Sequence, residues 1–343
     1  MLPAAIRKLT RLARDKGATD IHICVGAPIL FRIGRDLVPS SEGMMTPEIS
    51  ERMAYELLTD QQREQFLKEG DWDMMVQDDQ GRYRVNISMN DGFIGTVIRV
   101  LPDQARSIEQ LHLPNIVRVL AAQTKGMVLI TGSTSQGKSA TLSAMIDEIN
   151  THHRRHVVTI EDPIETLHIN KKSVVRQREV GRDTKSFNSG LRAALRQDPD
   201  VIAIGEMRDY ESIRIALTAA DTGVLVISTL HIISIDKMIE RLLSYAPEED
   251  TGHLRYLLAD ALQGVIHQEL IPAVDGGKRV GCEVLIAIDA VRNIIRRGES
   301  FMLRNVVATG SKHGMITMRQ SVTDLLGQGH ISADMAERVL ANY

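Results

Sequence analysis

The sequence predicts an α/β protein whose larger part is built on a parallel β-sheet. Four near-continuous apolar runs have the composition of strands that are buried on both faces of such a sheet. Stretches with apolar residues at helical spacing separate most of these runs, and this alternation is typical of βαβ units. The four runs are GMVLIT at 126–131, HVVTI at 156–160, DVIAIG at 200–205 and VLVIST at 224–229.

A smaller domain of mixed α and β structure is expected before the sheet. Residues 21–102 hold short alternating segments such as IHICV and RYRVNISM, broken by glycine, aspartate and proline, a pattern typical of half-buried strands. The segment that follows carries two prolines and several polar residues, which is typical of a connection between domains. We therefore expect an N-terminal α+β domain at 1–101, a linker at 102–115 and a larger domain at 116–343.

Helices are expected at both ends of the chain. Leu2, Ile6, Leu9 and Ala13 have helical spacing, and basic residues among them interrupt any apolar stretch of the kind found in signal peptides. From about residue 250, similar patterns predict a C-terminal helical subregion. These patterns are LRYLLADALQGVIHQEL at 254–270, AVRNIIRRG at 290–298 and MRQSVTDLLGQGHISADMAERVL at 318–340.

Composition narrows the functional classes. Hydrophobic residues form 43% and charged residues 25% of the 343 positions, the balance of a globular protein with a substantial core. No apolar run approaches the length of a transmembrane segment. A net charge of −3 and an aromatic content of 3% argue against direct nucleic-acid binding, which uses basic surfaces and stacking rings. Cys24 and Cys282 are the two cysteines, and their usage fits a reducing cytoplasm.

The most specific motif is GSTSQGKS at 132–139, which satisfies GxxxxGK[ST] and stands between a predicted strand and a predicted helix. Glycines in such a P-loop let backbone N–H groups approach phosphate, and the helix start adds a favourable dipole. Lys138 is expected to neutralise the β- and γ-phosphates of ATP, and Ser139 to hold Mg²⁺. The candidate nucleotide-binding residues of the loop are Ser133, Thr134, Ser135, Gln136, Gly137, Lys138, Ser139 and Ala140.

Polar groups follow the other three predicted strands. Glu161, Glu206 and His231 each come at or just after a strand end, and the carboxyl ends of parallel strands meet at one edge of a sheet, where ligands bind. Glu206 is the candidate to polarise the attacking water or help hold Mg²⁺, Glu161 to orient water or metal, and His231 to sense the γ-phosphate. The alternative is that these side chains only cap strand ends in solvent.

Longer blocks give the chain a family resemblance. It resembles the secretion-ATPase superfamily and, within it, the ATPases that retract type IV pili. The resemblance implies a RecA-like P-loop ATPase core, a smaller PAS-like N-terminal domain and C-terminal helices. The blocks that carry it are TIEDPIE at 159–165, QREVGRDTKSF at 177–187, LRAALRQDPDVIAIGEMRD at 191–209, TLH at 229–231 and LQGVIHQEL at 262–270.

The resemblance also implies roles for single residues. Glu161 in TIEDPIE is catalytic in the family's Asp box, and Glu206 in IGEMRD is the essential acid of an atypical Walker B motif. His231 belongs to the His box. Arginines of the smaller domain reach the nucleotide in this family, and the matching candidates are Arg82, Arg84 and Arg99.

For assembly, the resemblance implies a cytoplasmic homohexamer at the inner-membrane base of the pilus machine. Its expected partners are the membrane platform protein of that machine and, as a further candidate, a second motor ATPase. The four-cysteine zinc element of the assembly and secretion members is missing, which favours retraction. AVRNIIRRG at 290–298 resembles a motif associated with retraction, with Arg297 where the family has glutamate.

Several positions depart from the family's pattern. Ser135 stands where the P-loop usually has glycine, Val224 replaces the first histidine of the His box, and Ile232 and Ile233 follow TLH where Thr-Asn is usual. These departures keep two alternatives open: an assembly or secretion ATPase of a related type II or type IV secretion system, and a weakly active accessory retraction subunit. A nucleic-acid translocase is a third hypothesis, which the charge and aromatic content disfavour.

Overall fold

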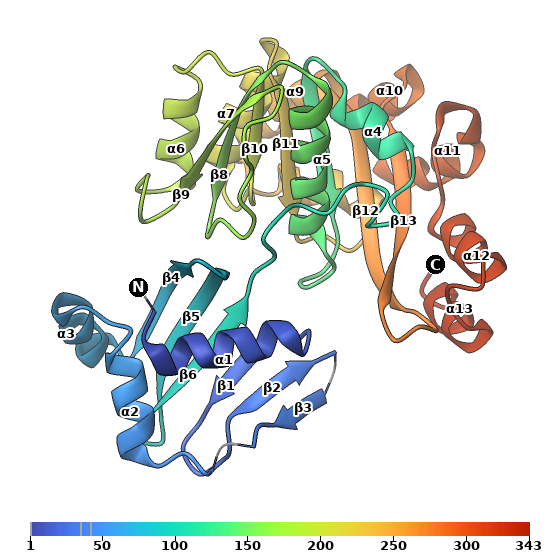
Figure 1. Cartoon of the computed structure of the whole chain (residues 1–343). Helices are drawn as coiled ribbons and strands as arrows, with labels where there is room; N and C mark the ends of the chain where they lie inside the picture. Colours follow the sequence, from blue (N-terminus) through green and yellow to red (C-terminus); the bar gives the residue numbers. More distant parts are fainter. Residues whose placement is uncertain (1, 35, 42) are drawn as a thin grey trace. The chain divides into compact units, whose positions relative to one another are not determined.

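The computed structural model describes residues 2–34, 36–41 and 43–343. The chain divides into two compact units, Met1–Asp103 and Gln104–Tyr343 (Figure 1). Ile108 and Leu113, in the segment expected as a linker, are buried in the core of the second unit. The chain downstream of Asp103 therefore packs with the second unit.

The first unit is an antiparallel sheet with helices on one face. The strand order is β3-β2-β1-β6-β5-β4. Apolar side chains on one face of the sheet, such as Ile21, Val85 and Ile98, share a core with Ile6 and Phe66 of the helices. The elements are α1 Ala4–Asp15, β1 Asp20–Ile23, β2 Leu30–Ile33, β3 Asp36–Pro39, α2 Pro47–Tyr55, α3 Asp60–Glu69, β4 Asp71–Asp78, β5 Gly81–Asn90 and β6 Phe93–Val100. The predicted N-terminal helix and the strands in IHICV and RYRVNISM are confirmed.

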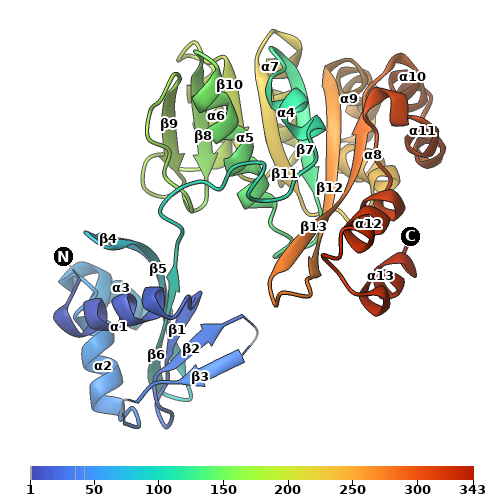
Figure 2. The same ribbon diagram turned by 45° about the vertical axis from the view of Figure 1, so that its right-hand side comes forward.

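The second unit is a sheet covered by helices on both faces (Figure 2). Its strand order is β13-β12-β7-β11-β10-β8-β9, and every neighbouring pair is parallel except β12 and β13. The elements up to the fourth strand of this sheet are α4 Ile116–Ala121, β7 Gly126–Thr131, α5 Lys138–His152, β8 His156–Glu161, β9 Val174–Glu179, α6 Phe187–Ala194 and β10 Val201–Ile204. They are followed by α7 Tyr210–Asp221, β11 Leu225–Leu230, α8 Ile235–Leu243, α9 Glu248–Ala261, β12 Leu262–Pro272 and β13 Lys278–Ile286. The chain ends with α10 Asp289–Arg297, α11 Leu303–Thr309, α12 Met318–Gly327 and α13 Ala333–Leu340.

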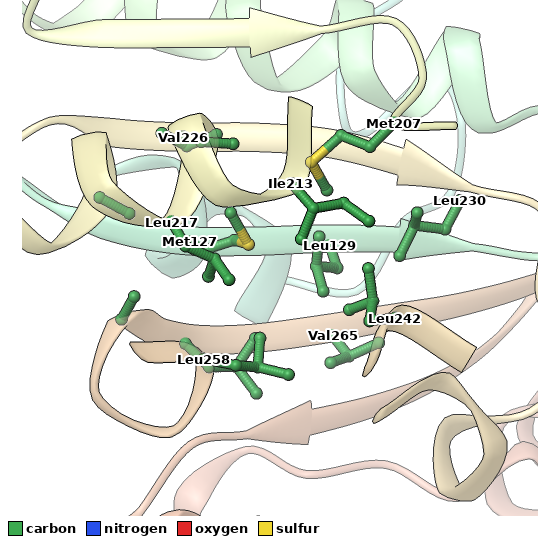
Figure 3. Close-up of a cluster of buried hydrophobic side chains, with 14 of the residues drawn as sticks. Met127, Leu129, Met207, Ile213, Leu217, Val226, Leu230, Leu242, Leu258 and Val265 are labelled. Atoms are coloured by element: carbon green, nitrogen blue, oxygen red, sulfur yellow. The ribbon is translucent and has the colours of Figure 1, made fainter. Parts of the chain in front are cut away.

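Alternate side chains of each central strand enter two different cores. In β7, Met127 and Leu129 pack with α7, α8 and α9, whereas Val128 and Ile130 pack with α4 and α5. Figure 3 shows the first of these cores, where Met127 and Leu129 lie among side chains from neighbouring strands and covering helices. Both faces of the strand are thus dry, which explains why the strands are continuous apolar runs and why the α/β prediction is confirmed.

The expectation of a helical subregion from about residue 250 needs a correction. Helix α9 ends at Ala261, and the LQGVIHQEL half of the segment expected to be helical is β12. A Cβ on Gly264 would lie 2.7 Å from Leu120 Cδ2 and 3.0 Å from the Leu285 carbonyl oxygen, so glycine permits the close packing of this strand. Short apolar runs fit a helix or a strand equally well, and here the unfilled edge of β7 decides for the strand.

The predicted helices in AVRNIIRRG and MRQSVTDLLGQGHISADMAERVL are confirmed as α10 and as the pair α12 and α13. Strand β9, which extends the sheet beyond β8, was not predicted. In the described residues, 2–34, 36–41 and 43–343, no helix has both the length and the apolar character needed to cross a bilayer.

Candidate nucleotide-binding site

The P-loop connects β7 to α5 and has the backbone of an anion-binding turn. Gly132, Ser135 and Gly137 have positive φ values of 146°, 62° and 80°, and Gly137 is the N-cap of α5. Residues 133–135 are exposed. The helix start therefore presents its first N–H groups and the positive end of its dipole at a solvent-facing loop, an arrangement suited to phosphate.

Ser135 is the non-glycine residue of the loop that has a left-handed backbone. This conformation costs an L-residue about 1–2 kcal/mol because its Cβ approaches the following carbonyl oxygen. The position that the family resemblance marked as unusual is therefore also a position that favours glycine. Ser135 retains the curvature of the loop at the cost of local strain.

Lys138 has a buried ammonium whose three donors are all used. Its Nζ donates to the carbonyl oxygens of Gly132 at 2.8 Å and Ser133 at 2.7 Å, and lies 3.2 Å from Nδ1 of His231. Burial lowers the pKa of Lys138, and the nearby carboxylate of Glu206 partly offsets this effect. The cation is therefore held inside the loop, where its partners are oxygen and nitrogen atoms that a phosphate oxygen can replace.

His231 joins Lys138 to Glu206. Its Nε2 lies 3.2 Å from Glu206 Oε1, on the opposite side of the ring from Lys138. A neutral ring that carries its proton on Nε2 satisfies both contacts, because Nδ1 then accepts from the ammonium and Nε2 donates to the carboxylate. Lys138, His231 and Glu206 thus form one hydrogen-bonded chain across three strand ends.

Arg208 holds the other oxygen of Glu206. Its Nε and one terminal nitrogen lie 2.8 Å and 2.7 Å from Glu206 Oε2. The Arg208 side chain is 68% exposed, whereas the Glu206 side chain is 17% exposed. The guanidinium is therefore a solvent-facing partner of a carboxylate that is mostly buried.

Gly205 places Glu206 at the end of its strand. The Gly205 N–H donates to the Ile160 carbonyl oxygen at 2.8 Å, and the hydroxyl of Thr229 donates to the Gly205 carbonyl oxygen. A Cβ on Gly205 would lie 3.3 Å from the Ile160 carbonyl oxygen. Hydrogen bonds to the adjoining strands β8 and β11 therefore fix the backbone just before Glu206.

Glu161 lies at the end of β8, the strand beside β10. Thr159 Oγ1 donates to Glu161 Oε1 at 2.6 Å, and Gln177 Nε2 donates to the same oxygen at 3.0 Å. The strand ends thus bring Glu161 to the same sheet edge as Glu206, but the two carboxylates have different hydrogen-bond partners. Gln177 also donates to the Thr166 carbonyl oxygen, which fixes its amide.

The three candidate arginines lie in the first unit, on the sheet face opposite its core. Arg84 and Arg99 are direct cross-strand neighbours. Arg99 pairs with Asp20 at 2.8 Å, and Arg84 lies 3.5 Å from Asp73. Arg82 shares their face because side chains alternate along β5, and it is buried. Each of Arg84 and Arg99 therefore has an acidic partner within its own unit.

The oxygen ligand at the start of α5 fits a magnesium ion that is coordinated mainly by the phosphates of a nucleotide. Ser139 lies in the first turn of α5 and is exposed, and its hydroxyl is a hard oxygen ligand of the type that Mg²⁺ prefers. Across the described ranges 2–34, 36–41 and 43–343, no cluster of three His, Cys, Asp or Glu side chains has the geometry to hold a metal ion. Such an ion usually takes one or two protein ligands together with phosphate oxygens. Both oxygens of Glu206 already have partners, so Ser139 is the better placed of the two candidate ligands.

The sequence did not indicate several residues that hold the site. Arg208 could have been suspected because it stands two positions after Glu206, whereas Gln177 and His267 had no signal apart from the family blocks. His267 of β12 is buried, with Nδ1 3.1 Å from Thr131 Oγ1 and Nε2 3.2 Å from the Tyr343 hydroxyl. Burial, with a smaller effect from Lys138, lowers the pKa of His267 to about 4. Its ring is therefore neutral at physiological pH.

Comparisons with known proteins identify the family of the chain. The type II/IV secretion system protein family matches residues 4–338. The type IV pilus retractation ATPase PilT of Pseudomonas aeruginosa is 38% identical over 333 residues, which cover 96% of each chain. A twitching motility protein of Neisseria gonorrhoeae is 40% identical over 315 residues, which cover 91% of this chain and 84% of that protein.

A solved structure shows the same fold with a nucleotide. The crystal structure of the pilus retraction motor PilT with bound ADP superimposes with a TM-score of 0.87 at 38% identity, and covers 96% of this chain and 95% of that chain. The similarity extends over both units of the chain.

The pKa of His267 makes a pH-dependent contribution to stability. The pKa of His267 is 6.5 in the unfolded chain and about 4 in the folded chain. At pH values between these two, the unfolded chain binds a proton that the folded chain does not, so acidification favours unfolding. At pH 5 this effect lowers the free energy of unfolding by about 2 kcal/mol. We expect His267→Gln, which can still bond Thr131 and Tyr343, to show a smaller fall in Tm between pH 7.5 and pH 5 than the wild type. The Tm of the exposed control His253→Gln should fall as much as that of the wild type. Equal falls in Tm for all three proteins would contradict the lowered pKa of His267.

The strain at Ser135 predicts opposite behaviour of two matched variants. Ser133→Gly adds only the chain freedom of glycine and should lower the free energy of unfolding. Ser135→Gly adds the same freedom but relieves the left-handed strain, so it should be more stable than Ser133→Gly by about 1 kcal/mol. Chemical denaturation of the two variants measures the difference. A Ser135→Gly variant that is no more stable than Ser133→Gly would show that Ser135 is not strained.

Proposed function

The chain belongs to the type II/IV secretion system protein family, and from this premise we propose that it is an ATP-hydrolysing motor that retracts a type IV pilus. The observation that carries the proposal is the series of side-chain contacts from Lys138 through His231 to Glu206, which links the P-loop to an acid at the end of another strand of the sheet. The names of the relatives, a pilus retraction ATPase and a twitching motility protein, support the purpose of that chemistry.

Nucleotide binding would use the loop and its lysine. The phosphates of ATP would lie against the N–H groups of the loop and the start of α5. Lys138 would exchange its bonds to the carbonyl oxygens of Gly132 and Ser133 for bonds to the β- and γ-phosphate oxygens. Ser139 would contribute an oxygen ligand to Mg²⁺. When bound, Mg²⁺ supplies positive charge that stabilises the phosphate oxygens in the transition state.

Hydrolysis would take place beside Glu206. A water oxygen attacks the γ-phosphorus, the bond from that phosphorus to the bridging oxygen of ADP breaks, and the proton of the water passes to Glu206. For this to happen Arg208 must release Oε2, and its exposed side chain permits that movement. Glu161, anchored by Thr159 and Gln177, would orient the water from the adjacent strand end.

His231 would couple the two halves of the reaction. Its Nδ1 accepts from Lys138 and its Nε2 donates to Glu206 in the neutral ring. When Lys138 turns to a γ-phosphate, Nδ1 loses its donor, and the ring can leave Glu206 and turn towards the phosphate. The occupancy of the phosphate site is thereby transmitted to Glu206 through one side chain.

The assembled motor would be a homohexamer at the inner-membrane base of a pilus machine, acting on a membrane platform protein. A second motor ATPase is a further candidate partner. In this proposal the N-terminal domain at 1–101 contributes Arg82, Arg84 and Arg99 to nucleotide binding. The start of the expected linker 102–115, before the buried Ile108, serves as the joint. Because Arg84 and Arg99 are paired with Asp73 and Asp20, these pairs must open for the arginines to reach phosphate.

Replacing Glu206 separates binding from hydrolysis. Glu206→Gln keeps the shape of the side chain but removes the proton acceptor, so steady-state ATP hydrolysis should fall by about a hundredfold or more while ATP still binds. Phosphate release and the binding of a fluorescent ATP analogue measure the two properties. Glu337→Gln, an exposed change on α13, should hydrolyse ATP at the wild-type rate. Wild-type turnover in Glu206→Gln would exclude this acid from catalysis.

The cellular purpose is tested by deleting the gene. A retraction motor that is lost leaves extension unopposed, so we expect cells with more surface pili and no twitching motility, counted by electron microscopy and on motility plates. A plasmid copy of the wild-type gene should restore both properties, and a Glu206→Gln copy should restore neither. Cells without pili would instead indicate an assembly motor, and cells with unchanged pili a secretion ATPase or an accessory subunit.

A further inference from the structure

Strand β12 is bonded to the P-loop through a pair of glutamines. Gln268 Nε2 donates to the backbone carbonyl oxygen of Gln136 at 2.6 Å. In return, the side-chain Oε1 of Gln136 accepts from the backbone N–H of Leu270 at 2.5 Å. One residue of the loop is thus held both by its backbone and by its side chain. We call these two hydrogen bonds the glutamine clamp.

The same strand touches the P-loop at both of its glycines. A Cβ on Gly132 would lie 2.5 Å from the backbone carbonyl oxygen of Gln268, and a Cβ on Gly137 would lie 3.4 Å from its Nε2. Gln268 therefore lies against the beginning and the end of the loop. Since the N–H groups that would hold phosphate lie between these two glycines, the position of Gln268 limits the curvature that the loop can take.

Stability alone does not explain a glutamine at this position. Gln268 is 1% exposed, and its Oε1 has no hydrogen-bond partner within the described parts of the chain, which include all of 104–343. A buried acceptor without a partner costs free energy, and an apolar residue of similar volume avoids that cost. The amide thus leaves an unpaired acceptor in the core, while an N–H of its Nε2 bonds to the loop.

We propose that Gln268 is a positioning residue for the nucleotide, which acts through Gln136 and does not itself touch the ligand. The clamp holds the loop in the conformation that directs its N–H groups at one phosphate. The loop therefore loses less conformational entropy when the nucleotide binds. This inference rests on the proposed nucleotide-binding role of the loop. It adds a residue outside the P-loop that sets the affinity of the loop for nucleoside diphosphates and triphosphates.

The clamp predicts that affinity and stability change in opposite directions. Gln268→Leu keeps the volume of the side chain but removes both the donor and the unpaired acceptor. Its Kd for a fluorescent ADP should rise about tenfold, the effect of losing one hydrogen bond of ordinary net strength, while its Tm stays equal to or above that of the wild type. Gln263→Leu, a matched change at a partly buried position of the same strand, should leave the Kd unchanged.

Gln136→Leu and the double variant test whether the two glutamines act as one unit. Gln136→Leu should raise the Kd for ADP to a similar extent, and the double variant should bind no more weakly than the weaker single variant. Effects that multiply in the double variant would show that the residues act independently and would overturn the clamp. An unchanged Kd in Gln268→Leu, or a raised Kd with a lower Tm, would also overturn it.

The same titrations keep this inference apart from the proposed function. A wild-type protein that does not bind ADP contradicts the proposed nucleotide site itself, and the clamp with it. A wild-type protein that binds ADP, together with a Gln268→Leu variant of equal affinity, leaves the site in place and overturns only the role of Gln268.

Discussion

The buried ammonium of Lys138 is the interaction on which the rest of the site depends. A cation taken out of water must have every donor satisfied, and here the acceptors are two carbonyl oxygens of the loop and His231. These carbonyls face inward only if the loop curves back over its own lysine, which requires the positive φ values at Gly132 and Gly137. The curve of the loop, its two glycines and the histidine that follows β11 thus together accommodate one buried charge.

The parallel sheet makes that arrangement possible. Strands β7, β11, β10 and β8 are neighbours and run in one direction, so the residues that follow them arrive at one edge. Most side chains inside these strands are apolar and buried, and Thr159 and Thr229 within them donate to groups at the strand ends. The acid, the histidine and the lysine of the site therefore follow the strands and meet at one edge of the sheet.

Much of this could be predicted from the sequence because it is local. The apolar runs, the P-loop spacing and the polar residues after each strand all lie within a few positions of one another, and they placed Glu206 and His231 beside Lys138. The contacts that depend on distant segments could not be predicted. Strand β12 was expected to be helical, and so the bonds from Gln268 and Leu270 to Gln136, 132 and 134 positions apart, had no local pattern to indicate them.

The departures from the family's pattern also acquire physical meaning in the structure. Ser135 occupies a left-handed backbone position, so its cost is conformational and does not remove a contact. Ile232 and Ile233 follow the histidine in a loop where the first is buried and the second is exposed, which leaves the bonds of His231 to Lys138 and Glu206 intact. The residues that bond to one another across the strand ends are thus preserved around altered neighbours.

A crystal structure of this chain with Mg²⁺ and a non-hydrolysable ATP analogue tests the central role of Lys138 most directly. We expect the β- and γ-phosphates to lie on the N–H groups of the P-loop, with Nζ of Lys138 bonded to their oxygens in place of the carbonyl oxygens of Gly132 and Ser133. Phosphates bound away from the loop, or a Lys138 that keeps its carbonyl partners while the nucleotide is bound, would contradict this role.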